Sequence, residues 1–261
     1  AQIRDIQAAI STIHERAILD RDRIGLFGMG GTGAGNALAA AARSTGVRCV
    51  VAYHVVADGA DWLRCMRTER EWHEFLSRVE TDRVRREAGH PGEMVDPRTE
   101  LMVAAPERRA NAAKREVDAK LPTRFHLASA ADLLSYRPLD EIAKPAHMTS
   151  IRTDAAGRVV EERQVPRTLA TLVATVAGDR VTPEAHAVAA FERSAPPKRL
   201  VRIRGVGHYE ADARCFDALA REFVDWFERW LGPPEHPARG AQAVVHTEAE
   251  TVEIAAPALP V

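Results

Sequence analysis

The fold is decided by residues 24–35, which read IGLFGMGGTGAG, a short apolar run that enters a cluster of glycines. The apolar run 24–27 predicts a buried strand, and the small residues of 34–43 predict a helix that packs very close to a sheet. A continuous apolar run at 47–56 predicts a parallel strand that is covered on both faces. Together with an amphipathic helix at 2–14, this order predicts an α/β fold with a mostly parallel sheet flanked by helices.

The rest of the chain contains an irregular part and a regular part. Residues 58–137 are rich in charge and carry apolar residues at helical spacing, which predicts a helical insertion. Residues 148–161 predict a β-hairpin around a glycine-containing loop. Alternate strands and helices are then predicted at 169–176, 183–193, 200–203 and 215–231. The Pro- and Ala-rich tail, 232–261, contains an apolar stretch at 244–247 that is either a strand or disordered.

Composition and charge restrict the classes of function. The 261 residues are 46% hydrophobic and 28% charged, which excludes a disordered or fibrous chain. The net charge of −1 lacks the basic excess of a typical nucleic-acid binder, and the sequence has no apolar run of about 18 residues that would span a membrane. Three scattered cysteines, Cys49, Cys65 and Cys215, form no CxxC pair, so we expect a reducing, cytoplasmic compartment and no structural zinc.

The glycine cluster allows a first interpretation, a dinucleotide-binding loop. Gly28, Gly30 and Gly33 match G-x-G-x-x-G between a strand and a helix, where backbone amides could hold a pyrophosphate. The fingerprint also needs an acidic residue at the end of the next strand, which binds the ribose. That place holds His54, and Asp58 lies beyond the strand. We therefore keep nucleotide binding as the less favoured alternative.

A second interpretation of the same turn is a nucleophile elbow, G-x-S-x-G, which also joins a strand to a helix. Its serine would fall at Gly30. Asp179 follows a predicted buried strand and His208 follows the next one, so the order is nucleophile, acid, base. Taken alone, Asp179 could cap a helix and His208 could be an ordinary loop histidine. Their placement at two successive strand ends favours the elbow.

On these residues the sequence resembles the α/β-hydrolase superfamily, in particular bacterial serine hydrolases with a helical cap. The resemblance covers nearly all of residues 1–231. It rests on DRIGLFG at 22–28, YRP at 136–138, DRVTP at 179–183, and the stretch from PKRL to GVGHY at 197–209. It implies an α/β-hydrolase fold in which residues 58–137 form the cap between two core segments, 1–57 and 138–231, with the tail 232–261 after them.

The resemblance also implies roles for individual residues. Asp179 would be the acid of a catalytic triad and His208 its base. Gly30 would occupy the position of the nucleophile, and Gly31 would offer an N–H group to the oxyanion hole.

For substrate contacts, the resemblance implies Met29 beside the turn, His54 after the next strand, and Trp62 and Met66 in the cap. A polar loop residue is the alternative for His54, and packing within the cap is the alternative for Trp62 and Met66.

The implied function is that of a serine hydrolase that acts on an ester, thioester or amide of a small acyl substrate, with no cofactor and no metal. Because Gly30 has no side chain to attack a carbonyl, we expect this form to be inactive or substrate-trapping. The alternative is a non-catalytic protein of the same fold that binds a small ligand. We expect no nucleic-acid or membrane partner, and a homodimer remains open.

The resemblance also bears on the length of the chain. Helix 2–14 would directly precede the elbow strand, and the strands and second oxyanion donor that usually come earlier would need roughly 70–100 more residues. Without them, strand 24–27 would be an apolar sheet edge, which folded proteins avoid. We therefore expect that the chain is the C-terminal part of a longer polypeptide, or that something else covers this edge.

Overall fold

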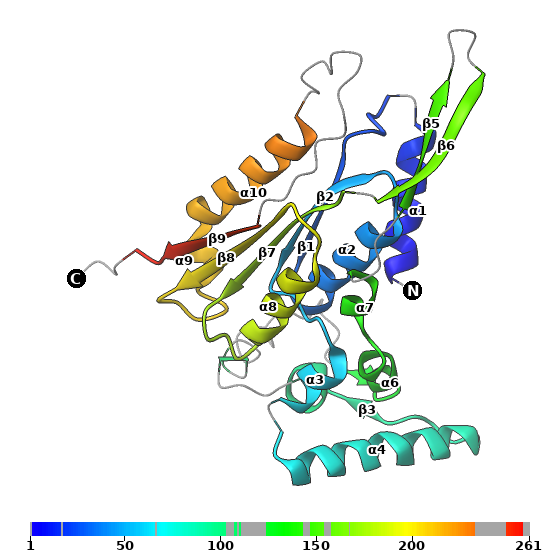
Figure 1. Cartoon of the computed structure of the whole chain (residues 1–261). Coiled ribbons are helices and arrows are strands. Elements are labelled where there is room, and N and C mark those ends of the chain that lie inside the picture. Colours follow the sequence, from blue (N-terminus) through cyan, green and yellow to red (C-terminus); the bar gives the residue numbers. More distant parts are fainter. Residues whose placement is uncertain are drawn as a thin grey trace.

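A computed structural model of the chain describes residues 2–16, 18–65, 67–102, 107–108, 110, 124–142, 147–153, 158–166, 168–232 and 249–257. Within these residues, a central five-stranded sheet has all of its neighbouring strands parallel (Figure 1). The strand order is β1 (Ile24–Met29), β2 (Val47–Tyr53), β7 (Ala170–Val176), β8 (Lys198–Arg204) and β9 (Ala249–Ala255). The predicted α/β fold with a mostly parallel sheet is thus confirmed.

Helices cover both faces of the sheet (Figure 1). On one face, α2 (Gly31–Arg43) packs on β1 and β2, and α8 (Glu184–Arg193) packs on β7 and β8. The amphipathic helix α1 (Gln2–Glu15) lies against α2 on that side. The opposite face is covered by α10 (Phe216–Leu231), which contacts β1, β2 and β7. The helices predicted at 2–14, 34–43, 183–193 and 215–231 are therefore present, with ends shifted by a few residues.

Strand β2 carries the core on both of its faces. Val50 packs with Leu38 of α2 on one face, whereas Val51 packs with Leu219 and Trp226 of α10 on the other. Successive side chains of a strand point to opposite faces, so the consecutive apolar residues from Cys49 to Tyr53 can be buried on both sides. Burial of these two apolar layers stabilises the arrangement of sheet and helices.

The insertion after β2 lies at the carboxyl end of the sheet and is mainly helical (Figure 1). Its elements are α3 (Gly59–Arg64), α4 (Glu69–Glu87), the π-helix η1 (Pro97–Leu101), α6 (Ser129–Leu134) and a two-stranded antiparallel pair, β3 (Met94–Val95) with β4 (Phe125–His126). The short strand pair is an addition to the helices that the sequence predicts. Trp62, Leu63 and Leu127 form a core of their own inside the insertion. From there α7 (Pro138–Ile142) returns to the side of α2 and α8.

Two further strand predictions have different outcomes. The hairpin predicted at 148–161 is confirmed as the antiparallel pair β5 (His147–Thr153) and β6 (Val159–Pro166), although its loop lies outside the described residues. In the tail, residues 244–247 also lie outside the described residues. The tail instead adds β9 to the sheet beside β8, and Ile254 enters the core. The tail therefore contributes to the sheet and to its core.

Three smaller findings complete the fold. None of the described helices is both long and apolar enough to cross a membrane. All three cysteines are free. In the described part of the chain, β1 is one edge of the sheet, and Phe27 on this strand is 51% exposed.

Candidate active site

The predicted elbow is the tight turn between β1 and α2. Gly30 caps the helix with φ 75° and ψ 155°, a backbone conformation that is essentially limited to glycine. A Cβ on Gly28 would lie 2.6 Å from the Ala37 Cβ and 2.6 Å from the Gly33 carbonyl oxygen. The strand β1 and the helix α2 can therefore approach this closely because Gly28 has no side chain. Apart from the adjoining residues and, for Gly33, the backbone of its own helix, no described atom lies within 4 Å of the Cβ position of either Gly30 or Gly33. The turn therefore has open space where a nucleophilic side chain would stand.

Asp179 lies in the turn after β7 and is held by local hydrogen bonds. Its Oδ1 accepts from the backbone N–H groups of Val181 (2.7 Å) and Thr182 (3.1 Å), and its Oδ2 accepts from the Thr182 hydroxyl (2.8 Å). The N-cap of α8 is Pro183, and it receives no side-chain cap. Asp179 thus organises its own turn but does not cap the helix, so the capping alternative explains only part of its environment.

The main partner of Asp179 is His208, in the turn after β8. The Nδ1 atom of His208 lies 2.7 Å from Asp179 Oδ2, and its side chain is 11% exposed. Burial would raise the pKa of the Asp179 carboxyl, but the facing imidazoles of His208 and His54 outweigh burial and hold this pKa well below its usual range. We therefore assign an ionised carboxylate that accepts the Nδ1–H of His208. This arrangement leaves Nε2 of His208 to act on another molecule.

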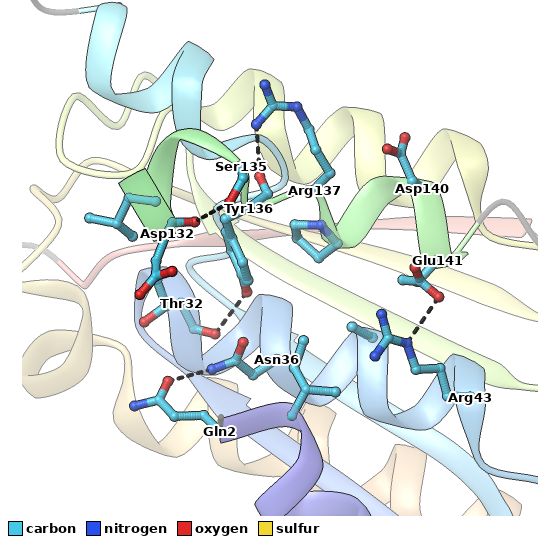
Figure 2. Close-up of a pocket in the computed structure, with 14 residues that line it drawn as sticks. Gln2, Thr32, Asn36, Arg43, Asp132, Ser135, Tyr136, Arg137, Asp140 and Glu141 are labelled. Carbon is cyan, nitrogen blue, oxygen red and sulfur yellow. Dashed lines mark hydrogen bonds and ion pairs between the residues drawn. The ribbon is translucent and has the colours of Figure 1, made fainter. Parts of the chain in front are cut away.

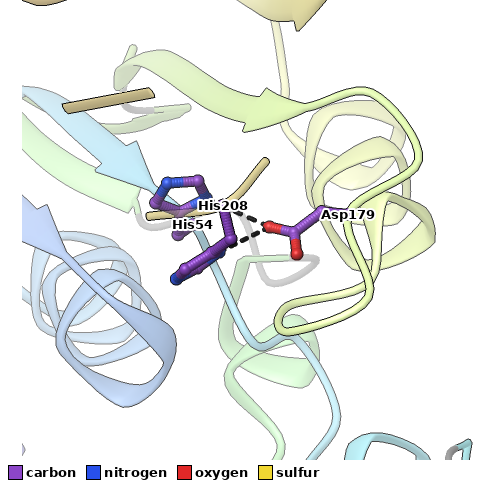
Figure 3. Close-up of side chains that lie close together, drawn as sticks. All are labelled: His54, Asp179 and His208. Atoms are coloured by element: carbon purple, nitrogen blue, oxygen red, sulfur yellow. Dashed lines mark hydrogen bonds and ion pairs between the residues drawn. The ribbon is translucent and has the colours of Figure 1, made fainter. Parts of the chain in front are cut away.

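His54 stands behind this pair. It directly follows β2 with a positive φ of 59°, and it is 2% exposed. Its ring lies between those of Tyr53 (ring centroids 3.8 Å apart) and His208 (4.0 Å). Its Nδ1 lies 3.4 Å from Asp179 Oδ2 but makes no hydrogen bond within the described part of the chain. Figure 3 shows both imidazoles facing the same carboxylate oxygen. Burial lowers the pKa of His54, which favours its neutral imidazole.

The same three side chains are a possible metal-binding group. Among the described residues, His54, Asp179 and His208 form a set whose ligand atoms all lie within 4.8 Å of one another. Asp179 Oδ2, however, already accepts from His208 and from the Thr182 hydroxyl. We therefore interpret the group as an acid–base cluster and assign no metal to it.

A cavity of about 670 Å³ opens beside the glycine turn. The core contributes to its wall Met29, the turn from Gly30 to Gly33, Thr182, His208 and Tyr209. The insertion contributes Trp62, Leu101, Met102, Arg108 and Phe125, among others. Two expected substrate contacts, Met29 and Trp62, are thus on the wall, whereas Met66 lies outside the described residues. His54 is not on the wall because its buried ring lies behind His208, so the expected direct contact with substrate does not fit its position.

A second cavity, of about 560 Å³, lies between α1, α2, α6 and α7 (Figure 2). Its polar groups pair with one another. The Tyr136 hydroxyl donates to the Thr32 carbonyl (3.0 Å), and the Asn36 amide donates to Gln2 (2.7 Å). In addition, Arg43 pairs with Glu141 across it (Figure 2). Because these groups are satisfied within the protein, this cavity carries no sign of a missing ligand.

Asp58 and His186 have structural roles that the sequence analysis did not anticipate. Asp58 caps α3 by accepting from the Asp61 N–H (2.8 Å) and pairs with Arg137 (3.0 Å), so it is not placed to bind a ribose. The buried His186 accepts the Ala57 N–H at Nδ1 (2.9 Å), and its Nε2 faces Asp61 (3.1 Å). These contacts fasten the loop after β2 to α8, and they count against the nucleotide-binding alternative.

Comparison with known proteins identifies the fold. No protein-family model matches the sequence, and no curated protein matches it significantly. Solved structures do match. The alpha/beta hydrolase GrgF from Penicillium sp. sh18 has a TM-score of 0.64 and 17% identity, over 88% of this chain and 71% of that one. DcsB, solved in complex with its substrate analogue, has a TM-score of 0.67 and 15% identity, over 88% and 72% of the two chains.

A monoacylglycerol lipase from Paleococcus ferrophilus matches more weakly. Its TM-score is 0.54 and its identity 16%, over 86% of this chain and 73% of that one. At such identities the similarity establishes the architecture alone. This chain has the α/β-hydrolase fold, as the sequence motifs imply.

Proposed function

We propose that this chain is a serine-hydrolase scaffold whose cavity binds a small acyl ester, thioester or amide, with Gly30 in the place of the nucleophile. The observation that carries the proposal is the 2.7 Å contact between Asp179 and His208, at a cavity that Gly30 also lines. Gly31 supports it from the first turn of α2, where backbone N–H groups have no partner within the helix and can stabilise an oxyanion.

His208 is the proposed base, and not His54, because the two imidazoles differ in access. His208 lines the cavity and is partly exposed, whereas His54 is almost fully buried behind it. Asp179 keeps the Nδ1–H of His208 in place and stabilises the imidazolium when Nε2 takes a proton. A proton taken by His54 would be separated from the substrate by the ring of His208.

In a Gly30→Ser variant, these parts would complete a catalytic cycle. The new hydroxyl attacks the acyl carbon while His208 Nε2 takes its proton, and the N–H of Gly31 stabilises the oxyanion. The tetrahedral intermediate then expels the leaving group, which receives the proton from His208. A water molecule, deprotonated by His208, attacks the acyl-enzyme and releases the acid and the serine.

In the protein as it stands, covalent catalysis is lost. The open space at the Cβ position of Gly30 has room for a water molecule. His208 could activate this water for direct attack on a bound acyl group, which gives slow turnover without an acyl-enzyme. The insertion, residues 58–137, serves as the cap over the cavity in this proposal, with Met29 and Trp62 as substrate contacts.

The test compares Gly30→Ser with Gly30→Ala, using p-nitrophenyl acetate and p-nitrophenyl butyrate. Both variants place a Cβ on the same left-handed backbone, so they share its strain, but only one has a nucleophile. We expect hydrolysis by Gly30→Ser alone, with a burst of p-nitrophenol, and its loss when His208→Ala is added. Equal rates for Gly30→Ser and Gly30→Ala would contradict the proposal.

A second candidate is a non-catalytic protein of the same fold that binds a small acyl compound. The observation that favours it is Gly30 itself, because a chain that only binds needs no nucleophile. Thermal unfolding of the parent and of His208→Ala, each with a panel of carboxylic esters, separates the two functions. If a ligand raises the unfolding temperature of the parent and of His208→Ala by the same amount, the result favours the non-catalytic function.

A further inference from the structure

The cavity wall contains a buried arginine that the proposed catalytic cycle does not use. Arg108, from the insertion, is 8% exposed. Its Cζ lies 5.7 Å from the centre of the Trp62 ring, and its Nη2 donates to the Val181 carbonyl at a long 3.4 Å. Val181 lies in the same turn as Asp179. Arg108 therefore joins the insertion to the catalytic turn at the cavity.

Within the described part of the chain, the guanidinium of Arg108 is left with unused donors. Among these residues its Nη1 reaches only the Met102 sulfur, at 3.7 Å, and its Nε has no hydrogen-bond partner. No acidic side chain of the described residues forms an ion pair with it, although most other buried or half-buried arginines here have one, such as Arg199 with Glu222. Burial lowers the pKa of Arg108 although the charge of Asp179 acts against this, and an arginine stays protonated in proteins. A buried positive charge without an ion-pair partner in contact with it is unfavourable, and a bound anion would supply that partner.

We propose that Arg108 binds a free carboxylate at the far end of the acyl group, so that the substrate is a half-ester, or the matching thioester or amide, of a dicarboxylic acid. This inference rests on the proposed function and adds the substrate class. The planar fork of a guanidinium matches the two oxygens of a carboxylate. The same wall carries the apolar side chains of Trp62, Leu101 and Phe125, which suit the methylene chain between the two ends.

The charged residues on the cavity wall favour a ligand group that carries a single negative charge. Of the described residues that line the cavity, Arg108 is the one basic residue besides His208, and Asp132 also lies on the wall. A doubly charged phosphate group is usually bound by several donors or cations. We therefore commit to a carboxylate, and phosphate is one of the outcomes that the experiment can return.

The first experiment measures binding by isothermal titration calorimetry to the full chain. The ligands are the monomethyl esters of succinate, glutarate and adipate, each paired with its neutral dimethyl ester. For at least one pair we expect the half-ester to bind about tenfold more tightly, the size expected of a charged hydrogen-bonded pair. Arg108→Met should abolish this preference. The matched control, Arg70→Met, removes the same charge from an exposed site on α4 and should keep it.

Two results overturn the inference: no half-ester binds better than its diester, or the preference survives in Arg108→Met. If Arg108→Met does not fold, Arg108→Lys decides, because lysine keeps the charge but loses the planar fork. If the ratio of half-ester affinity to diester affinity is at least about threefold lower in Arg108→Lys than in the parent, the inference is supported; a smaller change refutes it. Methyl phosphate is titrated in parallel. Tighter binding of methyl phosphate than of every half-ester would assign the site to phosphate instead.

The second experiment separates this inference from the proposed function. In the Gly30→Ser background, hydrolysis of half-esters and diesters is compared with and without Arg108→Met. If Gly30→Ser hydrolyses neutral esters but Arg108→Met changes no preference, the proposed function stands and the carboxylate site is refuted. If Gly30→Ser is inert while half-ester binding still depends on Arg108, the carboxylate site stands and the hydrolase proposal fails.

Discussion

The carboxylate of Asp179 and the imidazole of His208 lie 2.7 Å apart although they are 29 positions apart in the chain. Each residue follows one of two neighbouring parallel strands, β7 and β8, so the carboxyl ends of these strands bring the two turns together. Thr182 holds the carboxylate from the other side through its N–H and its hydroxyl. The register of the sheet, more than any local motif, therefore positions the acid–base pair.

The first prediction concerns this pair. In a Gly30→Ser background, we expect Asp179→Asn to lower kcat on the order of 10³- to 10⁴-fold, because an amide can hold His208 in the wrong tautomer. The measurement is steady-state hydrolysis of p-nitrophenyl butyrate. Asp225→Asn, which changes the same charge on the exposed side of α10, should leave kcat unchanged. A loss of less than about tenfold with Asp179→Asn would remove the acid from the proposed triad.

The second prediction concerns stability against pH. Burial lowers the pKa of His54 and of His186, so below the ordinary His pKa of about 6.5 the unfolded chain binds more protons than the folded one. The free energy of unfolding should therefore decrease as the pH falls through about 6.5, by at most ~1.4 kcal/mol per pH unit for each histidine. The lowered pKa of Asp179 acts in a separate window, and its contribution is lost only below about pH 4.

Urea unfolding between about pH 7.5 and pH 5 measures this dependence. Asparagine tolerates the positive φ of position 54, so His54→Asn removes the imidazole without changing the backbone. We expect this variant to have a smaller slope of unfolding free energy against pH, with a decrease of less than the contribution of one proton. His73→Gln, on the exposed surface of α4, should not. Stability that rises toward acid pH would show that these imidazoles are charged in the folded protein.

The third prediction concerns the contact between β1 and α2. A Cβ on Gly28 would overlap the Ala37 side chain and the Gly33 carbonyl, so Gly28→Ala should lower the free energy of unfolding by about 1–3 kcal/mol or more. Gly33→Ala is the matched control on the adjoining helix. Its new methyl group would meet no described atom outside its own helix, and alanine favours helix, so the substitution should raise stability by about 0.5–1 kcal/mol. If Gly28→Ala and Gly33→Ala changed the free energy of unfolding equally, β1 and α2 would have to lie further apart than in the structure.

The fourth prediction concerns β9. Ile254 packs in the core under α10, so Ile254→Ala should lower the free energy of unfolding by about 2–3 kcal/mol. Thr251→Ala, on the exposed face of the same strand, should change it by less than about 0.5 kcal/mol. Urea denaturation measures both. No difference between the variants would indicate that β9 does not pair with β8 in solution.

Local patterns predicted most of the fold. Apolar periodicity located α1, β2 and α10, and the order of elements indicated a parallel sheet. The alternation of Thr251, Val252, Glu253 and Ile254 also fits a strand with one buried face, but the Pro-rich segment before it masked this pattern. The small β3–β4 pair was missed because each strand has only two residues, too few for any period to show.

The candidate site was predictable only in part. Gly30, Asp179 and His208 stand at strand ends, where a sequence pattern can identify them. Arg108 could not be distinguished, because it lies in a segment full of arginines. What sets it apart is that it is buried and forms no ion pair with an acidic side chain in the described ranges. His54 was noticed for its place after β2, but its position behind His208 depends on how two turns from distant strands meet. The burial of Arg108 and the position of His54 behind His208 both depend on tertiary structure, which local sequence patterns do not show.

The direct pairing of β2 with β7 has a consequence for how such a protein can change. The whole insertion leaves the sheet after β2 and returns before β7, and these two strands close on each other without it. The acid–base pair lies on the sheet side, whereas Arg108 and Trp62 lie on the inserted side. If the proposed function holds, chemistry and selectivity are carried by separate parts of the polypeptide, so exchange of the inserted part would be a route to a new substrate with the same reaction.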